Sequence, residues 1–253
     1  MVMRPLNAFN AAQLPAPNYV EKNNYVRIII SGPSGSGKTF TLRRLLTDVF
    51  VHHYDLFIIY SMTDDTAEQY ANIITAANRR ALHFKQFSKG HMEMINNNQR
   101  IYEDRGFEPL RVMVIMDDYF GRFTKHEKGV LELFTMSRHW GISVVNIVHD
   151  LVFIDPAARD SATHIVLTRQ SNTAVYEKIY DEHLSLVVAR ENQFTLSAAA
   201  TKRQFVAFID SELQGFRAAI LTKSGSRLHD MLHIIGESRE RPTLSSIIRK
   251  PIS

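Results

Sequence analysis

Uninterrupted apolar runs alternate along the middle of the chain with segments whose apolar residues recur at helical spacing. Such runs predict buried strands, because fully apolar strands belong in a parallel sheet that helices cover on both faces. We predict strands at 25–31, 55–61, 83–87, 111–118, 142–148 and 164–168. Helices are predicted at 40–51, 64–77, 92–102 and 125–139. This alternation is typical of an α/β fold.

The pattern changes after the last of these strands. It is helical over about 171–200 and then predicts two more strands, at 204–210 and 216–221. With 253 residues, of which 45% are hydrophobic, the chain can bury one substantial core. We therefore predict a single α/β domain over residues 25–222.

Both ends of the chain differ from this domain. Residues 1–24 contain Leu14-Pro15-Ala16-Pro17 and lack strand or helix periodicity, so we predict an extended N-terminal arm. Within 223–253, basic residues outnumber acidic ones among interspersed Gly, Ser and Pro. This composition favours a flexible, solvated C-terminal tail over a nucleic-acid contact.

Composition narrows the function classes. The chain has no cysteine, which excludes disulfides, thiolate zinc sites and a cysteine nucleophile. Its formal net charge of +4 and sequence pI near 9.3 suit contact with a polyanion without proving it. No run approaches the roughly 18 apolar residues of a membrane span, and no apolar signal-peptide block follows Met1. We expect a soluble intracellular protein.

A complete phosphate-binding loop directly follows the first predicted strand. It reads Gly32-Pro33-Ser34-Gly35-Ser36-Gly37-Lys38-Thr39. The glycines let backbone N–H groups turn toward phosphate oxygens, and the following helix N-terminus adds partial positive charge. Lys38 would reach the β- and γ-phosphates of ATP, and Thr39 would bind Mg²⁺. The bland alternative, a Gly/Ser-rich surface turn, explains neither the preceding strand nor the following helix.

Two acidic residues end the strand predicted at 111–118. Because a P-loop sheet brings strand ends together, Asp117 is predicted to hold Mg²⁺ together with Thr39. Asp118 is then placed to orient or activate the attacking water. An apolar run that ends in Asp-Asp is by itself more often an ordinary strand end, and the phosphate loop is what favours the catalytic interpretation.

Three motifs carry a resemblance to a known family. They are Met113-Val114-Ile115-Met116-Asp117-Asp118, Ser137-Arg138-His139-Trp140-Gly141-Ile142-Ser143-Val144-Val145 and Ala158-Arg159-Asp160-Ser161-Ala162-Thr163-His164-Ile165-Val166. The chain resembles the poxvirus-type genome-packaging ATPases of the FtsK–HerA superfamily over about 25–169, and more loosely to 221. The resemblance implies a RecA-like P-loop NTPase fold with a mostly parallel sheet and helices on both faces. It also implies ATP-driven translocation of double-stranded DNA into a preformed capsid by a homo-oligomeric ring.

The same resemblance suggests further site residues. It makes Arg138 a candidate arginine finger, with Arg159 and Arg169 as weaker candidates. The alternative for Arg138 is a cation that the dipole favours at a helix C-terminus. The family's usual γ-phosphate-sensing Gln is replaced here by His149. An imidazole can donate one hydrogen bond but also titrates near neutral pH, so this departure affects how hydrolysis would be coupled to movement.

Other histidines carry little signal. His229 and His233 have the i,i+4 spacing of a helical zinc pair, but the sequence offers no evident third ligand.

We therefore predict a viral DNA-packaging ATPase that uses ATP and Mg²⁺. Its expected partners are double-stranded DNA, further copies of itself, and capsid or portal-vertex proteins. Its expected location is the host cytoplasm or viral factory, or association with the virion. A cellular FtsK–HerA-like translocase and a nucleotide-binding accessory scaffold without motor activity remain open. A small-molecule P-loop kinase is disfavoured by Asp118 and the segment around Arg138.

Overall fold

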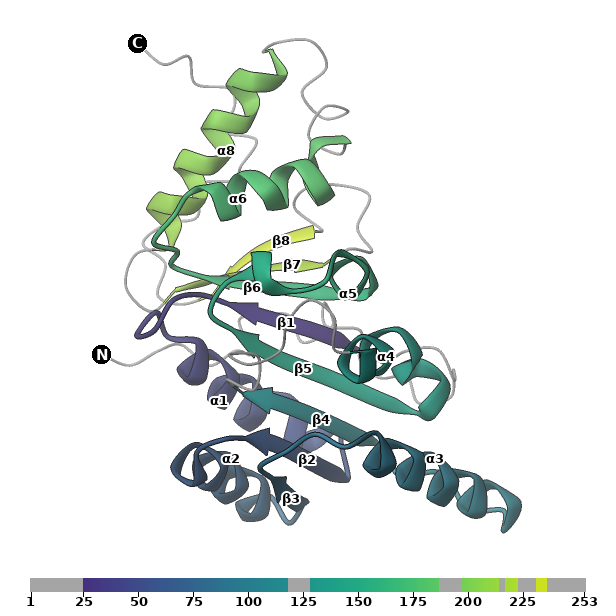
Figure 1. Ribbon diagram of the computed structural model, residues 1–253. Helices are drawn as coiled ribbons and strands as arrows, with labels where there is room; N and C mark the ends of the chain where they lie inside the picture. The colour runs from purple at the N-terminus through teal and green to yellow at the C-terminus, as the bar shows by residue number, and fades with distance from the viewer. Residues whose placement is uncertain (1–24, 118–127, 187–196, 214–216, 223–230, 236–253) are drawn as a thin grey trace.

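The computed structural model describes residues 25–117, 128–186, 197–213, 217–222 and 231–235. Its strands are β1 (Arg27–Ser31), β2 (Leu56–Ser61), β3 (Arg80–Phe84), β4 (Val112–Asp117), β5 (Ile142–Val148), β6 (His164–Thr168), β7 (Ala218–Thr222) and β8 (Leu232–Ile235). Within the described residues they form one sheet in the order β3-β2-β4-β5-β1-β6-β7-β8 (Figure 1). Strands β1 to β6 pair in parallel, whereas β7 is antiparallel to both β6 and β8.

Helices cover both faces of this sheet. They are α1 (Lys38–Asp48), α2 (Asp64–Ala76), α3 (Lys89–Asp104), α4 (Lys128–Met136), α5 (Pro156–Ser161), α6 (Ala174–Ile179) and α8 (Ala198–Glu212). Short 3₁₀ turns lie at Phe50–His52, Ser137–Trp140 and Leu151–Phe153, and a π-helical turn at Tyr180–Leu184 continues α6. Among the described residues, no helix is both long and apolar enough to cross a bilayer.

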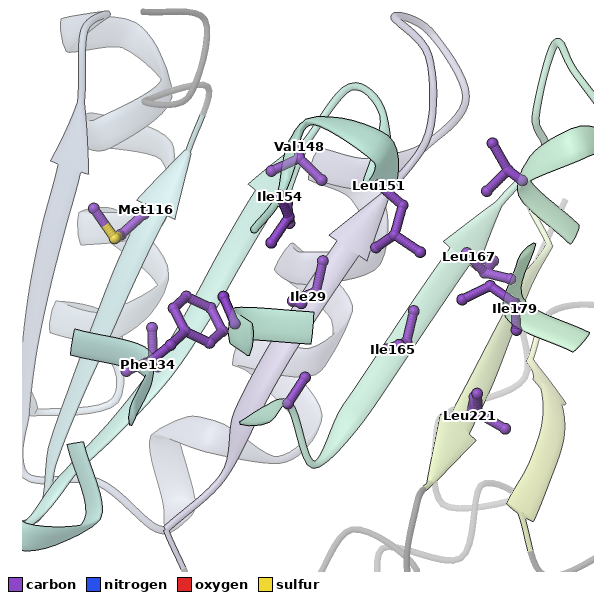
Figure 2. Close-up of a cluster of buried hydrophobic side chains, with 14 of the residues drawn as sticks. Ile29, Met116, Phe134, Val148, Leu151, Ile154, Ile165, Leu167, Ile179 and Leu221 are labelled. Atoms are coloured by element: carbon purple, nitrogen blue, oxygen red, sulfur yellow. The ribbon is translucent and has the colours of Figure 1, made fainter. Parts of the chain in front are cut away.

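The apolar residues of each central strand divide between two cores. On β1, Ile28 and Ile30 pack with Leu45 of α1 in one core. Ile29 lies in the other core, with Phe134 of α4, among residues that Figure 2 shows. Because successive strand side chains point to opposite faces, a run that is apolar throughout can fill both cores at once. The continuous apolar runs therefore arise from a sheet that is buried on both sides.

Most predicted elements of the α/β domain are confirmed. The strands predicted at 142–148 and 164–168 have those bounds in the structure, and β2 begins one residue later than predicted. The predicted strand at 83–87 is displaced: β3 spans Arg80–Phe84. The N-terminal arm predicted at 1–24 lies outside the described residues.

The strand predicted at 204–210 is wrong, since this segment lies inside α8. Ser197 caps that helix by accepting a hydrogen bond from the Ala200 N–H at 3.3 Å. Phe205, Phe208 and Ile209 are buried at helical spacing. The local run of apolar residues suits either structure, and the alanine-rich start with its serine cap favours the helix.

Part of the predicted C-terminal tail belongs to the sheet. Leu232–Ile235 forms β8 and pairs with β7, so the sheet extends past the predicted domain boundary at 222. The basic and polar residues that surround this short apolar segment concealed it in the sequence.

An ion pair ties β4 to β2 at their amino ends. The carboxylate of Asp55 accepts hydrogen bonds from Nε and Nη2 of Arg111 at 2.8 and 2.7 Å, and from the Arg111 backbone N–H at 3.1 Å. Nη1 of Arg79 lies 3.4 Å from the same carboxylate. The side-chain hydrogen bond from Arg111 is the main reason why the pKa of Asp55 lies below its usual range.

Replacing Asp55 by Asn is expected to lower the free energy of unfolding by about 1–3 kcal/mol at pH 7, because charge-assisted hydrogen bonds are lost. A lowered native pKa means that the stabilisation is complete above the ordinary value of 3.8 and disappears as pH falls through the native pKa. The difference in unfolding free energy between wild type and Asp55→Asn should therefore become smaller at acidic pH. Urea unfolding at pH 7 and pH 3 measures it, with Asp64→Asn at an exposed ion pair as control. A difference that is the same at pH 7 and pH 3 would contradict the assignment of this stabilisation to the Asp55 carboxylate.

Candidate nucleotide-binding site

The phosphate loop lies at the carboxyl edge of the parallel sheet. β1 ends at Ser31, residues 32–37 form the loop, and α1 begins at Lys38. The register places Asp117 of β4 beside Ile147 of β5, which in turn lies beside Ile30 of β1. The ends of β4 and β1 are thus level at this edge, with the single strand β5 between them.

The loop's conformation depends on its glycines. Gly35 and Gly37 have φ of 75° and 97°, in the left-handed region that glycine adopts without strain. Gly37 is the N-cap of α1, and no side chain caps that helix. The amide of Gly32 donates to the carbonyl of Val148 at 3.2 Å, which joins the loop to β5. The first turn of α1 can therefore present its N–H groups to an anion.

Lys38 is buried, and its ammonium turns back over the loop. Its Nζ donates to the carbonyl oxygen of Pro33 at 2.9 Å and lies 3.4 Å from Nδ1 of His149. His149, which directly follows β5, is itself exposed. The predicted phosphate-binding lysine and the predicted γ-phosphate sensor are thus neighbours. The sequence did not predict this contact, which joins the loop to the end of β5.

Asp117 is a buried carboxylate, only 3% exposed, at the end of β4. Its Oδ2 accepts a hydrogen bond from the hydroxyl of Tyr70 on α2. Thr39, the other predicted metal ligand, is half-buried in the first turn of α1. Asp118, the predicted catalytic acid, lies outside the described residues, as does His229 of the zinc alternative. Among the described residues, no cluster of three or more acidic or histidine side chains could hold a metal ion.

Sequence reasoning missed two residues at the end of β6 that contact the loop or the end of β1 just before it. Oγ1 of Thr168 lies 2.7 Å from Oγ of Ser36, and Nε2 of Gln170 donates to the carbonyl of Ser31 at 3.0 Å. Both Thr168 and Gln170 are buried. Their position in the sequence could have indicated them, because they lie at the end of an apolar strand whose carboxyl end is beside that of β1. Arg169 between them is exposed at the same edge.

Arg138 lies at the opposite edge of the sheet. It is in the 3₁₀ turn Ser137–Trp140, which follows α4 and precedes the amino end of β5. Burial lowers the pKa of Arg27, the first residue of β1, and the nearby charge of Arg138 lowers it further. Arg138 and the phosphate loop are therefore at opposite ends of β1. Its position after α4 also fits the dipole alternative.

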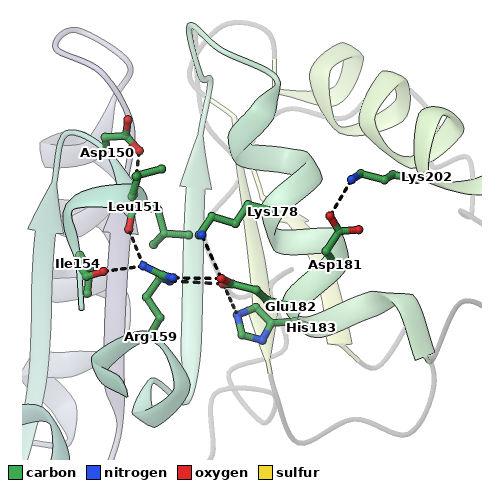
Figure 3. A network of polar contacts seen from close by, with 10 residues as sticks. Asp150, Leu151, Ile154, Arg159, Lys178, Asp181, Glu182, His183 and Lys202 are labelled. Carbon is green, nitrogen blue, oxygen red and sulfur yellow. Dashed lines mark hydrogen bonds and ion pairs between the residues drawn. The ribbon is translucent and has the colours of Figure 1, made fainter. Parts of the chain in front are cut away.

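Arg159, in contrast, is buried in a network of polar contacts within the protein (Figure 3). Its side chain is 5% exposed and binds Glu182 of the π-helical turn, with Nη2 to Oε1 at 3.0 Å. Its Nη1 donates to the backbone carbonyls of Ile154 and Leu151. Burial would raise the pKa of Glu182, but hydrogen bonding and charge from Arg159 and Lys178 hold it below the usual range. In this conformation Arg159 ties the segment after His149 to α6.

The strand order and the glycine-rich loop together define a P-loop NTPase. The chain belongs to the Poxvirus A32 protein family, whose model matches residues 18–210. Both the predicted family and the predicted fold class are confirmed.

The similar solved structures include viral packaging proteins. The genome packaging NTPase B204 from Sulfolobus turreted icosahedral virus 2, in complex with AMP, aligns with a TM-score of 0.56 at 12% identity, covering 83% of this chain and 96% of that chain. The same protein in complex with AMPPCP gives 0.55 at 12% identity, covering 85% and 99%. B204, the DNA-packaging ATPase from Sulfolobus Turreted Icosahedral Virus, gives 0.53 at 13% identity, covering 85% and 97%.

A curated relative gives a partial match. The ORC1-type DNA replication protein of Methanothermobacter thermautotrophicus is 30% identical over 128 residues. The match covers 51% of this chain and 31% of the archaeal protein, so it spans less than a third of that relative.

Replacing Arg159 by Met is expected to cost about 3 kcal/mol of unfolding free energy, because Glu182 and two backbone carbonyls lose the donors that Arg159 supplies, although Lys178 still pairs with Glu182. Glu182→Gln, which keeps an acceptor for Arg159, should cost less. Chemical denaturation of the three proteins measures both losses. A finger residue would behave differently: if Arg159→Met kept wild-type stability but lost turnover, Arg159 would return to the list of finger candidates.

Proposed function

We propose that the protein is an ATP-hydrolysing motor subunit that moves double-stranded DNA into a preformed viral capsid. The observation that carries the proposal is the convergence of Lys38, Asp117 and His149 on one edge of a P-loop sheet in a member of the A32 family. The similar B204 structures, which are those of a genome packaging NTPase and a DNA-packaging ATPase, support it. The proposed setting is the host cytoplasm or viral factory, with capsid or portal-vertex proteins as partners.

The proposed nucleotide is ATP, held by residues 32–39. B204 has been solved with AMPPCP and with ATP-gammaS, which supports this choice. Lys38 would exchange the Pro33 carbonyl for the β- and γ-phosphates, because a phosphate oxygen is the stronger acceptor for an ammonium. His149 would then face the γ-phosphate together with Lys38.

Mg²⁺ is the proposed metal, with Thr39 and Asp117 as its protein ligands. The residues fit, because Asp117 is a buried carboxylate level with the start of the loop. Mg²⁺ in such sites keeps several waters and uses one or two protein ligands plus phosphates, so no cluster of carboxylates is needed. When bound, the ion would neutralise charge on the phosphates. The Tyr70 hydroxyl would orient the Asp117 carboxylate, and Asp118 would accept the proton of the attacking water.

A homo-oligomeric ring is proposed because of the position of Arg138. A residue at the amino edge of the sheet cannot reach the loop of its own subunit, so it could act on ATP only in a neighbouring copy. Arg169 is the alternative, since it is exposed at the edge that carries the loop.

The second candidate function is a nucleotide-binding accessory role in DNA replication. The partial match to an archaeal ORC1-type protein favours it. A motor and an accessory scaffold differ in one measurable property, which is phosphate release that long double-stranded DNA stimulates.

The first test compares Lys38→Ala with wild type. Loss of the ammonium should abolish ATP turnover, because it is the main side-chain charge on the β- and γ-phosphates. Phosphate release with and without linear double-stranded DNA measures this, and Lys202→Ala on α8 serves as a control that keeps wild-type rates. Wild-type hydrolysis without DNA stimulation would favour the accessory role, and hydrolysis by Lys38→Ala would contradict the site.

The second test concerns Arg138. If it acts in a neighbouring subunit, Arg138→Ala should fold and bind ATP but hydrolyse it about 10³-fold more slowly. Mixing it with Lys38→Ala should restore part of the activity, because intact loops then meet intact fingers. The matched control is Arg203→Ala, because Arg203 is exposed as Arg138 is. A mixture that forms hetero-assemblies and remains inactive would show that Arg138 has only the dipole role.

A further inference from the structure

The carboxyl end of β6 contacts the phosphate loop through a buried side chain. Thr168 uses one hydroxyl twice: Oγ1 lies 2.7 Å from Oγ of Ser36 and donates to the carbonyl of Ser31 at 3.2 Å. Thr168 is fully buried. Its partners stand on both sides of the first loop glycine, so the contact spans the start of the loop.

Gly32 shows how close this contact is. A Cβ built on Gly32 would lie 1.9 Å from Oγ1 of Thr168 and 2.5 Å from Oγ of Ser36. Contacts this short exceed any tolerance of packed atoms, so only glycine allows β6 and the loop to approach this closely. The first glycine of the motif is therefore required by its packing against β6.

Gln170 extends the contact to α6. Its Nε2 donates to the carbonyls of Ser31 and Thr168 at 3.0 and 2.8 Å. Its backbone N–H donates to the hydroxyl of Tyr176 at 2.9 Å. Tyr176 is fully buried in α6, so Gln170 is held through both its side chain and its backbone N–H.

We infer that Thr168 and Gln170 are positioning residues that hold the phosphate loop in its binding conformation, an inference that rests on the proposed ATPase function. A loop whose amides must converge on phosphates loses conformational entropy when it binds them, and contacts that order it beforehand reduce that cost. Thr168 acts on the loop through Ser36 and Ser31, and Gln170 acts through Ser31. Neither residue needs to touch ATP.

The test is Thr168→Val, which keeps the branched shape and removes the hydroxyl. One net hydrogen bond corresponds to about a tenfold change in an equilibrium constant. We expect the KM for ATP, and the Kd for ATPγS measured by calorimetry, to rise about tenfold, with a smaller change in kcat. Thr168→Ser keeps the hydroxyl and should restore values within about twofold of wild type.

The matched control is Thr201→Val on α8. Thr201 is also buried, and its hydroxyl donates to the backbone carbonyl of Ser197 at 3.1 Å. It should lose thermal stability as Thr168→Val does, while its KM stays at the wild-type value. Equal KM values for the two valine variants would overturn the inference, as would a Thr168→Ser variant as impaired as Thr168→Val.

Ser36→Ala covers the case in which Thr168→Val folds poorly, because it removes the other hydroxyl of the same contact and should also raise the Kd for ATPγS. Where Thr168→Val folds, the two changes are combined in a double-mutant cycle. If the Ser36–Thr168 contact carries the effect, the double variant should bind ATPγS no more weakly than the weaker single variant. If the double variant instead shows a Kd for ATPγS raised by the product of the two single effects, the inference is overturned. A wild-type protein that neither binds nor hydrolyses ATP would refute the proposed function itself, whereas an active wild type with an unchanged Thr168→Val refutes only the positioning role.

Discussion

The parallel alignment of β4, β5, β1 and β6 is the constraint on which the site depends. Parallel strands bring their carboxyl ends to one edge, and the register makes Asp117, Ile147 and Ile30 level across three strands. The loop with its lysine therefore lies at the same edge as the acid of β4, although the two are far apart in the sequence. Because this alignment needs both faces buried, the two apolar cores are as necessary to the site as its polar residues.

A second set of polar contacts links the segment after this edge to the outer helices. Arg159 binds the carbonyls of Leu151 and Ile154 and the carboxylate of Glu182. Beyond it, Lys202 of α8 pairs with Asp181 of the same π-helical turn at 2.6 Å (Figure 3). A buried arginine is costly to desolvate, and Arg159 makes four hydrogen bonds to defined acceptors here. The cost of burying Arg159 is therefore offset by contacts with the segment that follows His149.

The sequence was sufficient for features that depend on local pattern. The glycine-rich loop, the apolar strands and the acid that ends β4 each follow from residue type and spacing, and the structure brings Lys38 and Asp117 to one edge as expected. The helix at 198–212 was missed in part because a short apolar run fits either period. The contacts of Thr168 and the burial of Arg159 were not predictable in this way, since both depend on partners far away in the sequence. An arginine in a family motif looks the same whether it reaches a nucleotide or a glutamate.

The contact between Lys38 and His149 gives the histidine a role that a glutamine would fill differently. At 3.4 Å the ammonium can only donate, so Nδ1 of His149 must accept, and the ring proton then lies on Nε2. A glutamine, which always has one donor and one acceptor, would offer both on a single amide group. In this tautomer of histidine the acceptor, Nδ1, and the donor, Nε2–H, lie on two different ring atoms, and Nδ1 is the one that faces Lys38. The contact with Lys38 therefore selects which ring atom of His149 is left to donate.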